Sequence, residues 1–255
     1  MVNPSTAATL RALHHGRAPG DPLVLPGPWD AASARVFEEA GYEALATPSA
    51  GIALSLGYED GQVPPKEMFE AVGRITRAVG VPVTMDAETG YGLTAKELVE
   101  RLLEAGAVGC NLEDSYEGED AGAGAGGGST GVLRDPREQA DWLARVREAA
   151  GDHLVVNARV DTFVRGVADP ERAIERARLY VAAGADCVYP ILAPPEAIPV
   201  LRAGIEGPLN VLALPDGPSL RELGELGATR VTFGPGLLRR TMAALRDITD
   251  GLRRA

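Results

Sequence analysis

Short apolar stretches alternate along the whole chain with longer stretches in which apolar residues recur at helical spacing. The apolar stretches predict eight β-strands, at residues 22–27, 42–51, 81–90, 107–115, 153–161, 185–192, 208–215 and 228–235. The stretches between them predict eight α-helices, at residues 30–41, 64–80, 94–106, 135–151, 169–184, 194–204, 219–227 and 236–255. Continuous apolar runs, rather than alternating ones, are typical of strands covered on both faces.

Eight strand–helix units in 255 residues predict one (β/α)8 TIM-type barrel that spans residues 1–255. The alternative is an open, doubly wound parallel sheet. Glycine follows six of the predicted helices, where a left-handed residue commonly ends a helix, at positions 41, 80, 106, 151, 184 and 227. A polar loop is expected at 52–63, and the glycine-rich segment after the fourth strand predicts a mobile gating loop at about 117–131.

Composition narrows the class of protein. The chain is 45% hydrophobic and 24% charged, as in soluble globular proteins. A net charge of −11 argues against nucleic acid as a partner, because phosphate binding requires clustered Lys and Arg. Cys110 and Cys187 lie in apolar runs, so we expect buried thiols in a reducing compartment. No signal peptide and no membrane span is recognisable, and the expected location is therefore cytoplasmic.

Acidic residues follow several successive predicted strands. The stretch VTMDAETGYG, residues 83–92, places Asp86 and Glu88 after the third strand. Glu113 and Asp114 follow the fourth strand, and Asp60 lies in the loop after the second. In a β/α barrel, functional side chains gather where the strands end, so these carboxylates should meet at one rim. Each acidic group alone is equally compatible with a helix cap or a turn.

So many like charges require a neutralising partner. A hard cation such as Mg²⁺ or Mn²⁺ takes oxygen ligands and retains some of its water. Arg159, on the fifth strand, provides a planar fork for a carboxylate or phosphonate, although it is also spaced to pair with Asp161. Trp29 ends the first strand, and the segment PSAG, 48–51, offers backbone N–H groups, with Ala50 among them. These features predict a site for a small doubly charged acid bound to a metal ion.

Several longer stretches carry a family resemblance. They are GPWDAASARVFEEAGYEALATPSAGIALSLGYEDG, VTMDAETGYG, GCNLEDS, VNARVD and YVAAGADCVYP. In order and spacing they resemble the isocitrate lyase and phosphoenolpyruvate mutase superfamily over nearly the whole chain. The resemblance implies a (β/α)8 barrel, Mg²⁺, and a small 2-oxo or 2-hydroxy acid whose carbon–carbon or phosphorus–carbon bond is made or broken. It also implies a homo-oligomer, a dimer or tetramer, since relatives form tetramers that often exchange a C-terminal helix.

The resemblance assigns roles residue by residue. Asp86 would bind the metal directly, with Glu88, Glu113 and Asp60 holding its water ligands. Ser49, Gly51 and Arg159 would bind the acid group of the substrate. The expected site consists of catalytic residues Arg159, Asp60 and Glu113, substrate-binding residues Trp29, Ser49, Ala50, Gly51 and Arg159, and metal-binding residues Asp86, Glu88 and Glu113.

Two departures from the family pattern limit the reaction. Isocitrate and methylisocitrate lyases carry a Lys-Lys-Cys-Gly-His motif after the fourth strand, and the mutases carry a Lys and an Asn-Ser pair there. Residues 117–132 contain no Lys, Cys or His, and Glu88 stands where the family has Asp. We therefore expect a lyase or decarboxylase of a small 2-oxo diacid such as oxaloacetate, acting through an enolate, and no cleavage of isocitrate or methylisocitrate. The alternatives are a phosphonopyruvate hydrolase or mutase, and a barrel that binds a small acid without turnover.

Overall fold

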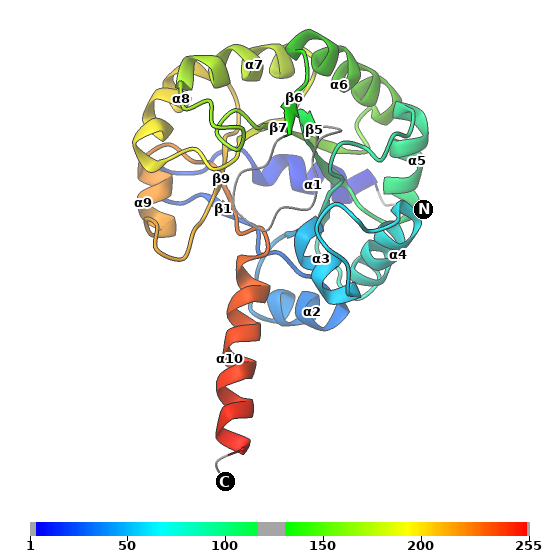
Figure 1. Cartoon of the computed structure of the whole chain (residues 1–255). Helices are drawn as coiled ribbons and strands as arrows, with labels where there is room; N and C mark the ends of the chain where they lie inside the picture. The colour runs from blue at the N-terminus through cyan, green and yellow to red at the C-terminus, as the bar shows by residue number, and fades with distance from the viewer. Residues whose placement is uncertain (1–3, 117–130, 254–255) are drawn as a thin grey trace.

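The computed structural model describes residues 4–116 and 131–253, and in these ranges the chain forms a ring of parallel strands inside a ring of helices (Figure 1). The strands of the ring are β1 (Leu23–Val24), β2 (Leu45–Thr47), β3 (Val83–Asp86), β4 (Gly109–Leu112), β7 (Val155–Val160), β8 (Cys187–Pro190), β9 (Asn210–Leu212) and β10 (Arg230–Thr232). Each falls inside one of the predicted apolar stretches, because residues buried on both faces leave no polar alternation.

The ring is closed by hydrogen bonds at two seams. Ladder pairing gives a five-stranded sheet, β2-β3-β4-β7-β8, and a three-stranded sheet, β1-β10-β9. A parallel bridge between Val188 and Leu209 joins β8 to β9. The Ala46 N–H donates to the Pro26 carbonyl over 3.1 Å and joins β1 to β2. The predicted TIM-type barrel is therefore confirmed, and the alternative of an open doubly wound sheet is wrong.

Half of the described outer helices begin at a polar side-chain cap. Their bounds are α2 (Ala31–Glu39), α3 (Ser49–Leu56), α4 (Pro65–Thr76), α5 (Ala95–Glu104), α6 (Pro136–Ala150), α7 (Pro170–Ala182), η1 (Pro195–Ala197), α8 (Ile198–Gly204), α9 (Leu220–Glu225) and α10 (Gly236–Leu252). Asp30 caps α2 by accepting from the Ser33 N–H, and Thr94 caps α5 by accepting from the Glu97 N–H. The carboxylate that follows the first strand is thus committed to a helix terminus.

Two local predictions are wrong, and one pair of strands was not predicted. Residues 49–56 form α3 instead of a strand end and a polar loop, because Pro48 lacks the N–H that a ladder needs and its carbonyl caps the helix. A hairpin of β5 (Ser115–Tyr116) and β6 (Val132–Leu133) branches from the end of β4. Gly80 lacks the left-handed conformation found at the other five predicted helix-ending glycines, because α4 already ends at Thr76.

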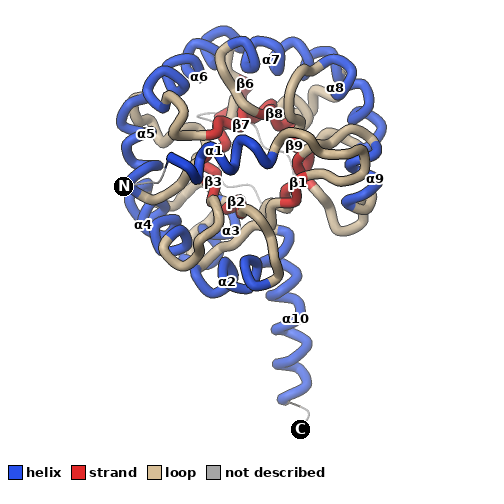
Figure 2. The backbone as a smooth tube through the Cα atoms, turned by 180° about the vertical axis from the view of Figure 1, so that it is seen from behind, coloured by secondary structure: helices blue, strands red, loops and turns tan. Residues whose placement is uncertain are grey.

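An additional helix, α1 (Pro4–Leu13), crosses the end of the barrel opposite the strand carboxyl ends (Figure 2). The buried residues Ala7 and Leu10 pack with Leu23, Leu25 and neighbouring aliphatic groups. A Cβ at Gly109 would lie 3.0 Å from the Leu10 side chain, which is too close for a larger residue. Glycine at this position therefore lets β4 and α1 pack closely. Helix α1 therefore closes the lower end of the barrel.

Polar side chains fill much of the barrel interior, where branched apolar residues are usual. Arg230, on β10, is fully buried, and its Nη2 lies 3.4 Å from Asn111 Oδ1 on β4, across the barrel. Its Nη1 lies 3.4 Å from His14 Nε2, just after α1. His14 Nδ1 lies 2.7 Å from the Leu10 carbonyl, so that nitrogen carries the hydrogen and Nε2 accepts from Arg230.

Two further expectations concern the described residues. Cys110 and Cys187 are buried free thiols, as predicted. No helix in the described ranges is long and apolar enough to cross a lipid bilayer. The proposed gating loop falls on residues 117–130, which lie outside the described part of the chain, so it stays a prediction.

His14 should make the protein less stable in acid. Burial, followed by the neighbouring Arg230 charge, lowers the pKa of His14 from 6.5 to about 4. Between these values the unfolded chain binds a proton that the folded protein excludes, so stability falls as pH drops from 6.5 towards 4. The loss should approach about 3 kcal/mol. Urea unfolding of wild type and His14→Gln at pH 5 and pH 7 measures the part of this loss that falls between those two pH values, about 2 kcal/mol in wild type. A pH dependence unchanged in the variant would contradict the assignment.

Candidate active site

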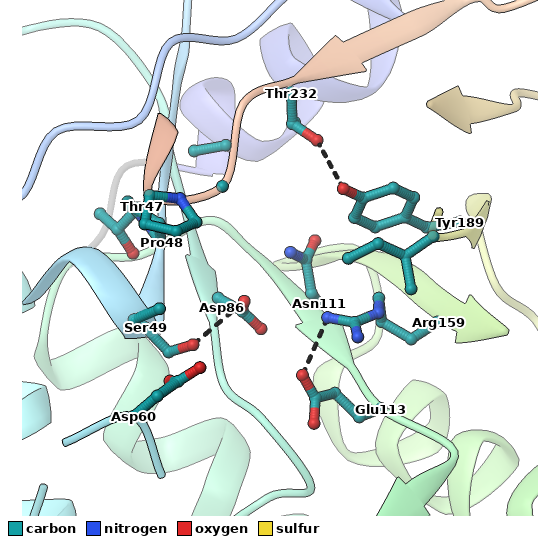
Figure 3. Close-up of a pocket in the computed structure, with 15 residues that line it drawn as sticks. Thr47, Pro48, Ser49, Asp60, Asp86, Asn111, Glu113, Arg159, Tyr189 and Thr232 are labelled. Atoms are coloured by element: carbon teal, nitrogen blue, oxygen red, sulfur yellow. Dashed lines mark hydrogen bonds and ion pairs between the residues drawn. The ribbon is translucent and has the colours of Figure 1, made fainter. Parts of the chain in front are cut away.

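A cavity of about 160 Å³ opens at the carboxyl ends of the strands (Figure 3). Its walls come from the β2–α3 junction, the ends of β3, β4, β7 and β8, and the turn between β10 and α10. The residues lining it are Ala46, Thr47, Pro48, Ser49, Ala50, Asp60, Asp86, Asn111, Glu113, Arg159, Tyr189, Ile191, Thr232, Gly234 and Pro235. This position is the one that β/α barrels use for their chemistry.

One wall of the cavity is acidic. Ser49 stands in the first turn of α3 and donates from Oγ to Asp86 Oδ2 over 3.3 Å. Asp60 approaches from the loop after α3, and Glu113 approaches from the end of β4 (Figure 3). The N-terminus of α3 also directs backbone N–H groups toward this end of the barrel, which favours an anion there.

Arg159 is the cation nearest to these carboxylates in the described structure. Its Nη1 donates to Glu113 Oε1 over 2.8 Å, and its Nε donates to Asp161 Oδ1 over 2.9 Å. The guanidinium also lies 5.5 Å from the centre of the Tyr189 ring. Despite burial, the three neighbouring acids Asp161, Glu113 and Asp86 hold the pKa of Arg159 above its ordinary value. Arg159 therefore both faces the cavity and pairs with Asp161. The sequence had left open whether it faces a substrate or pairs with Asp161, and the structure shows a position that allows both.

A single guanidinium does not neutralise the acidic wall. Burial, with the nearby Asp86 and Asp60 charges, raises the pKa of Glu88 to about 7. Burial, opposed by Arg159 but reinforced by Asp86, raises the pKa of Glu113 to about 8. Burial also raises the pKa of Asp86, and Asp60 adds to this shift. The described residues therefore carry more negative charge at this rim than they can accommodate without protons or a cation.

The donor atoms fit a hard divalent ion. Asp86 Oδ1 and Glu88 Oε1 are buried and have no hydrogen-bond partner, which is costly for a carboxylate oxygen. Glu88 also takes φ +50°, a left-handed conformation that is strained for a side chain of this kind. Within 4–116 and 131–253, no three His, Cys, Asp or Glu side chains are close enough to enclose an ion. The unpartnered oxygens of Asp86 and Glu88 suit Mg²⁺, which binds through one or two carboxylates and keeps several waters.

The structure brings together most of the predicted site residues. Ser49, Ala50, Asp60, Asp86, Glu113 and Arg159 all line the cavity. Trp29, Gly51 and Glu88 do not. Trp29 packs edge-on against Phe37, and a Cβ at Gly51 would lie 2.7 Å from the Pro48 ring, so glycine there lets α3 start close to the strand end.

Sequence reasoning missed the opposite, neutral wall. Asn111, Tyr189, Ile191 and Thr232 lie at or near the ends of strands β4, β8 and β10, together with the turn residues Gly234 and Pro235. Two signals were available. Tyr189 and Thr232 are polar groups inside largely apolar runs, and both stand three positions before a predicted strand end.

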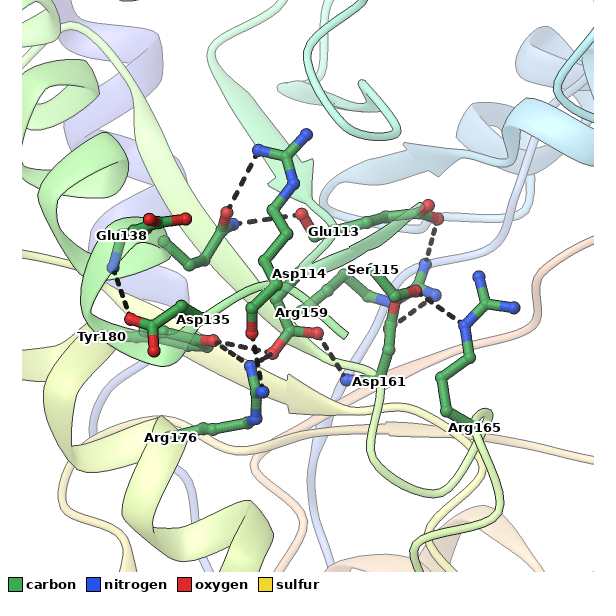
Figure 4. A network of polar contacts seen from close by, with 12 residues as sticks. Glu113, Asp114, Ser115, Asp135, Glu138, Arg159, Asp161, Arg165, Arg176 and Tyr180 are labelled. Atoms are coloured by element: carbon green, nitrogen blue, oxygen red, sulfur yellow. Dashed lines mark hydrogen bonds and ion pairs between the residues drawn. The ribbon is translucent and has the colours of Figure 1, made fainter. Parts of the chain in front are cut away.

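Asp114, next to Glu113, faces away from the cavity into a polar network (Figure 4). It accepts from Tyr180 Oη over 2.7 Å and from Arg176 Nη1 over 2.9 Å, both on α7. Its other oxygen accepts from the Asp161 backbone N–H over 2.8 Å. Ser115 donates to the Asp161 carboxylate over 2.6 Å. Through Asp161 this network holds Arg159 in position, so Asp114 supports the site without lining it.

Removing Arg176 should destabilise the fold because it leaves Asp114, which is 0% exposed, without its cation. Arg176→Met is expected to lower the free energy of unfolding by roughly 3 kcal/mol. Arg172→Met is the matched control on the same helix, since Arg172 and its partner Glu175 are each 65% exposed. That variant should change stability by less than about 1 kcal/mol. Equal losses in the two variants, measured by urea unfolding, would show that the network is not a support.

Comparison with known proteins identifies the family of the chain. Residues 10–253 match the family model described as phosphoenolpyruvate phosphomutase. A candidate phosphonomutase from Burkholderia cenocepacia J2315 is 39% identical, with a TM-score of 0.84 over 96% of this chain and 99% of the other. The 2-methylisocitrate lyase of Aeropyrum pernix is 35% identical over 82% of this chain and 64% of its own.

A third relative was solved with a ligand. It is an oxaloacetate acetylhydrolase in complex with the inhibitor 3,3-difluorooxalacetate, 25% identical, with a TM-score of 0.84 over 99% of this chain and 88% of the other. The resemblance inferred from the sequence is confirmed. The chain belongs to the phosphoenolpyruvate phosphomutase family, within the isocitrate lyase and phosphoenolpyruvate mutase superfamily.

Proposed function

We propose that this protein is a Mg²⁺-dependent lyase or decarboxylase that acts on a small 2-oxo diacid such as oxaloacetate and proceeds through an enolate. The observation that carries the proposal is the composition of the cavity. Asp86, Asp60, Glu113 and Arg159 line the same space of about 160 Å³. Such a space suits a small acid, and the excess of carboxylates suits a divalent cation beside it.

The roles of the residues follow from their positions. Asp86 would be the direct metal ligand, and Glu88, Glu113 and Asp60 would hold water ligands. When bound, Mg²⁺ would polarise the 2-oxo group and stabilise negative charge on its oxygen. Arg159 would bind a carboxylate of the substrate, together with Ser49 and the backbone N–H of Ala50 at the start of α3. The Gly51 N–H, also expected to bind the acid group, already donates to the Pro48 carbonyl over 3.1 Å.

The relatives support this substrate class in general terms. The acetylhydrolase binds an analogue of oxaloacetate, and the methylisocitrate lyase by its name breaks a carbon–carbon bond. Residues 117–131 lack the Lys-Lys-Cys-Gly-His motif, which argues against isocitrate or methylisocitrate as substrate. The candidate phosphonomutase supports the second possibility, cleavage or rearrangement of phosphonopyruvate.

Turnover of oxaloacetate tests the proposal. Purified protein with Mg²⁺ should release pyruvate from oxaloacetate faster than Mg²⁺ alone, and EDTA should stop the release. Phosphonopyruvate, substituted malates and citrates should be tested in parallel, with isocitrate and methylisocitrate inactive. Faster pyruvate release from phosphonopyruvate would favour the second possibility. Oxalate binding without turnover of any of these acids would favour a binding protein.

Loss of Asp86 tests the metal site directly. Asp86→Ala should abolish Mg²⁺ binding in calorimetry, since it removes the direct ligand and leaves the other carboxylates without an ion between them. Glu100→Ala, an exposed acid of α5, is the control and should bind Mg²⁺ like wild type. Unchanged affinity in Asp86→Ala would show that the ion, if bound at all, lies elsewhere.

The protein is further proposed to be a homo-oligomer, a dimer or tetramer. Helix α10 extends away from the barrel (Figure 1). Along one face it exposes Leu245, Ile248 and Leu252, which are 49%, 60% and 72% accessible. Apolar residues spaced in this way on a projecting helix are a docking face, and a second copy of the chain would cover it.

Light scattering at micromolar concentration should therefore give a mass of at least twice 26.6 kDa. Ile248→Glu, which places a charge in the middle of the apolar face of α10, should shift the mass toward that of one chain. Asp247→Lys, one position away on the helix, tests charge alone and should leave the mass unchanged. A single-chain mass for wild type would contradict the proposal.

A further inference from the structure

An enolate must gain a proton at carbon before a 2-oxo acid can leave as product. The acidic wall of the cavity is a poor source, because its carboxylates are engaged by Arg159, by Ser49 or by the proposed cation. Among the residues lining the cavity in the described structure, no Lys, Cys or His is present. With the carboxylates ionised around the proposed cation, the groups that still hold an acidic hydrogen there are the hydroxyls of Thr47, Ser49, Tyr189 and Thr232.

Tyr189 occupies the neutral wall, across the cavity from Asp86 and Ser49 (Figure 3). It follows Val188 on β8 and is paired in register with Arg159 on β7, so both side chains point to the same interior. Its side chain is almost completely buried, with 3% of the residue exposed. Because the cavity is only about 160 Å³, a ligand held at the acidic wall must also approach this hydroxyl.

Two contacts prepare the phenol for proton donation. Thr232 Oγ1 lies 3.2 Å from Tyr189 Oη and 3.3 Å from Asn210 Oδ1, which fixes the hydroxyl between the cavity and the barrel interior. The Arg159 guanidinium lies 5.5 Å from the ring centre, where it would stabilise a phenolate. Burial raises the pKa of Tyr189 to about 12 although Arg159 opposes it, so the phenol is protonated at neutral pH.

The other hydroxyls are less suited. A phenol is a far stronger acid than the aliphatic alcohols of Ser and Thr. Ser49 Oγ is also directed at Asp86. Tyr91 is the nearest alternative phenol, but its hydroxyl lies 3.5 Å from the backbone carbonyl of Asp86, and the residue does not line the cavity.

We propose that Tyr189 is the catalytic acid of this site, a role that rests on the proposed enolate chemistry. The phenol O–H bond breaks, and the proton joins C3 of the enolate. The electron pair of the enolate double bond forms the new C–H bond, and the 2-oxo group is restored. The phenolate left behind, held by Arg159 and Thr232, regains a proton from water before the next cycle.

The test compares wild type, Tyr189→Phe and Tyr91→Phe, each with Mg²⁺. Three quantities are measured: kcat for pyruvate formation from oxaloacetate, the rate at which the methyl protons of pyruvate exchange with D₂O, and the Kd of oxalate. Tyr189→Phe should lower kcat and the exchange rate by about 100-fold, the usual size of a general-acid contribution. Its oxalate Kd should stay within about twofold, because the metal and Arg159 bind that anion. Tyr91→Phe should resemble wild type in all three.

The outcomes separate this proposal from the proposed function. Wild-type rates in Tyr189→Phe, or the larger loss in Tyr91→Phe, would overturn the role of Tyr189 and leave the lyase intact. A loss of oxalate binding in step with kcat would show a structural role and also overturn it. If wild-type protein binds oxalate but neither releases pyruvate nor exchanges the methyl protons of pyruvate, the proposed function is wrong. The role of Tyr189 as its catalytic acid is then wrong as well.

Discussion

The buried Arg159 guanidinium is the interaction on which the site depends, because it is surrounded by more negative charge than it can balance. It donates to Glu113 over 2.8 Å and to Asp161 over 2.9 Å, and Asp86 lies close enough to influence its pKa. A buried ion pair is costly unless its remaining hydrogen-bonding capacity is used. Behind Asp161, hydrogen bonds with Asp114, which in turn binds Arg176 and Tyr180, use this capacity. What that network leaves unbalanced is negative charge that faces the cavity, and this residual charge is the basis of the proposed metal site.

The architecture was predictable because one physical signal repeats along the chain. A strand buried on both faces must be apolar throughout, and the helix that packs over it must be amphipathic. Each β/α unit can therefore be recognised in the sequence without reference to the others. The failures occurred where a local rule was overridden. Residues 49–56 were expected to be a strand end and a polar loop, yet Pro48 ends the ladder and α3 begins. Helix α1 has a weak pattern because much of what it covers is the open end of a barrel, which only the closed ring creates.

The site was predictable in its charged half only. Strand ends of a barrel converge, so successive acidic ends can be placed at one rim without coordinates. Whether an acid faces in or out depends on strand alternation: Asn111 points inward, Glu113 follows it, and Asp114 turns to the network. Tyr189 and Thr232 could not be identified in this way. Each is compatible with an ordinary core position, and only their proximity across β8 and β10 makes them a wall.

The polar character of the cavity continues below its floor. Asn111 lines the cavity and also contacts Arg230, which in turn meets His14 beside the closing helix. Arg230 Nε, Asn157 Oδ1 and Asn210 Nδ2 are buried in this interior without hydrogen-bond partners. Such groups destabilise a fold, and a purely structural barrel fills the same space with branched apolar side chains. A positive charge below the floor favours an anion above it, so these destabilising groups contribute to the electrostatics of the rim. Arg230 also adds to the effect of burial that lowers the pKa of His14, so the same buried arginine contributes to the acid sensitivity of the fold.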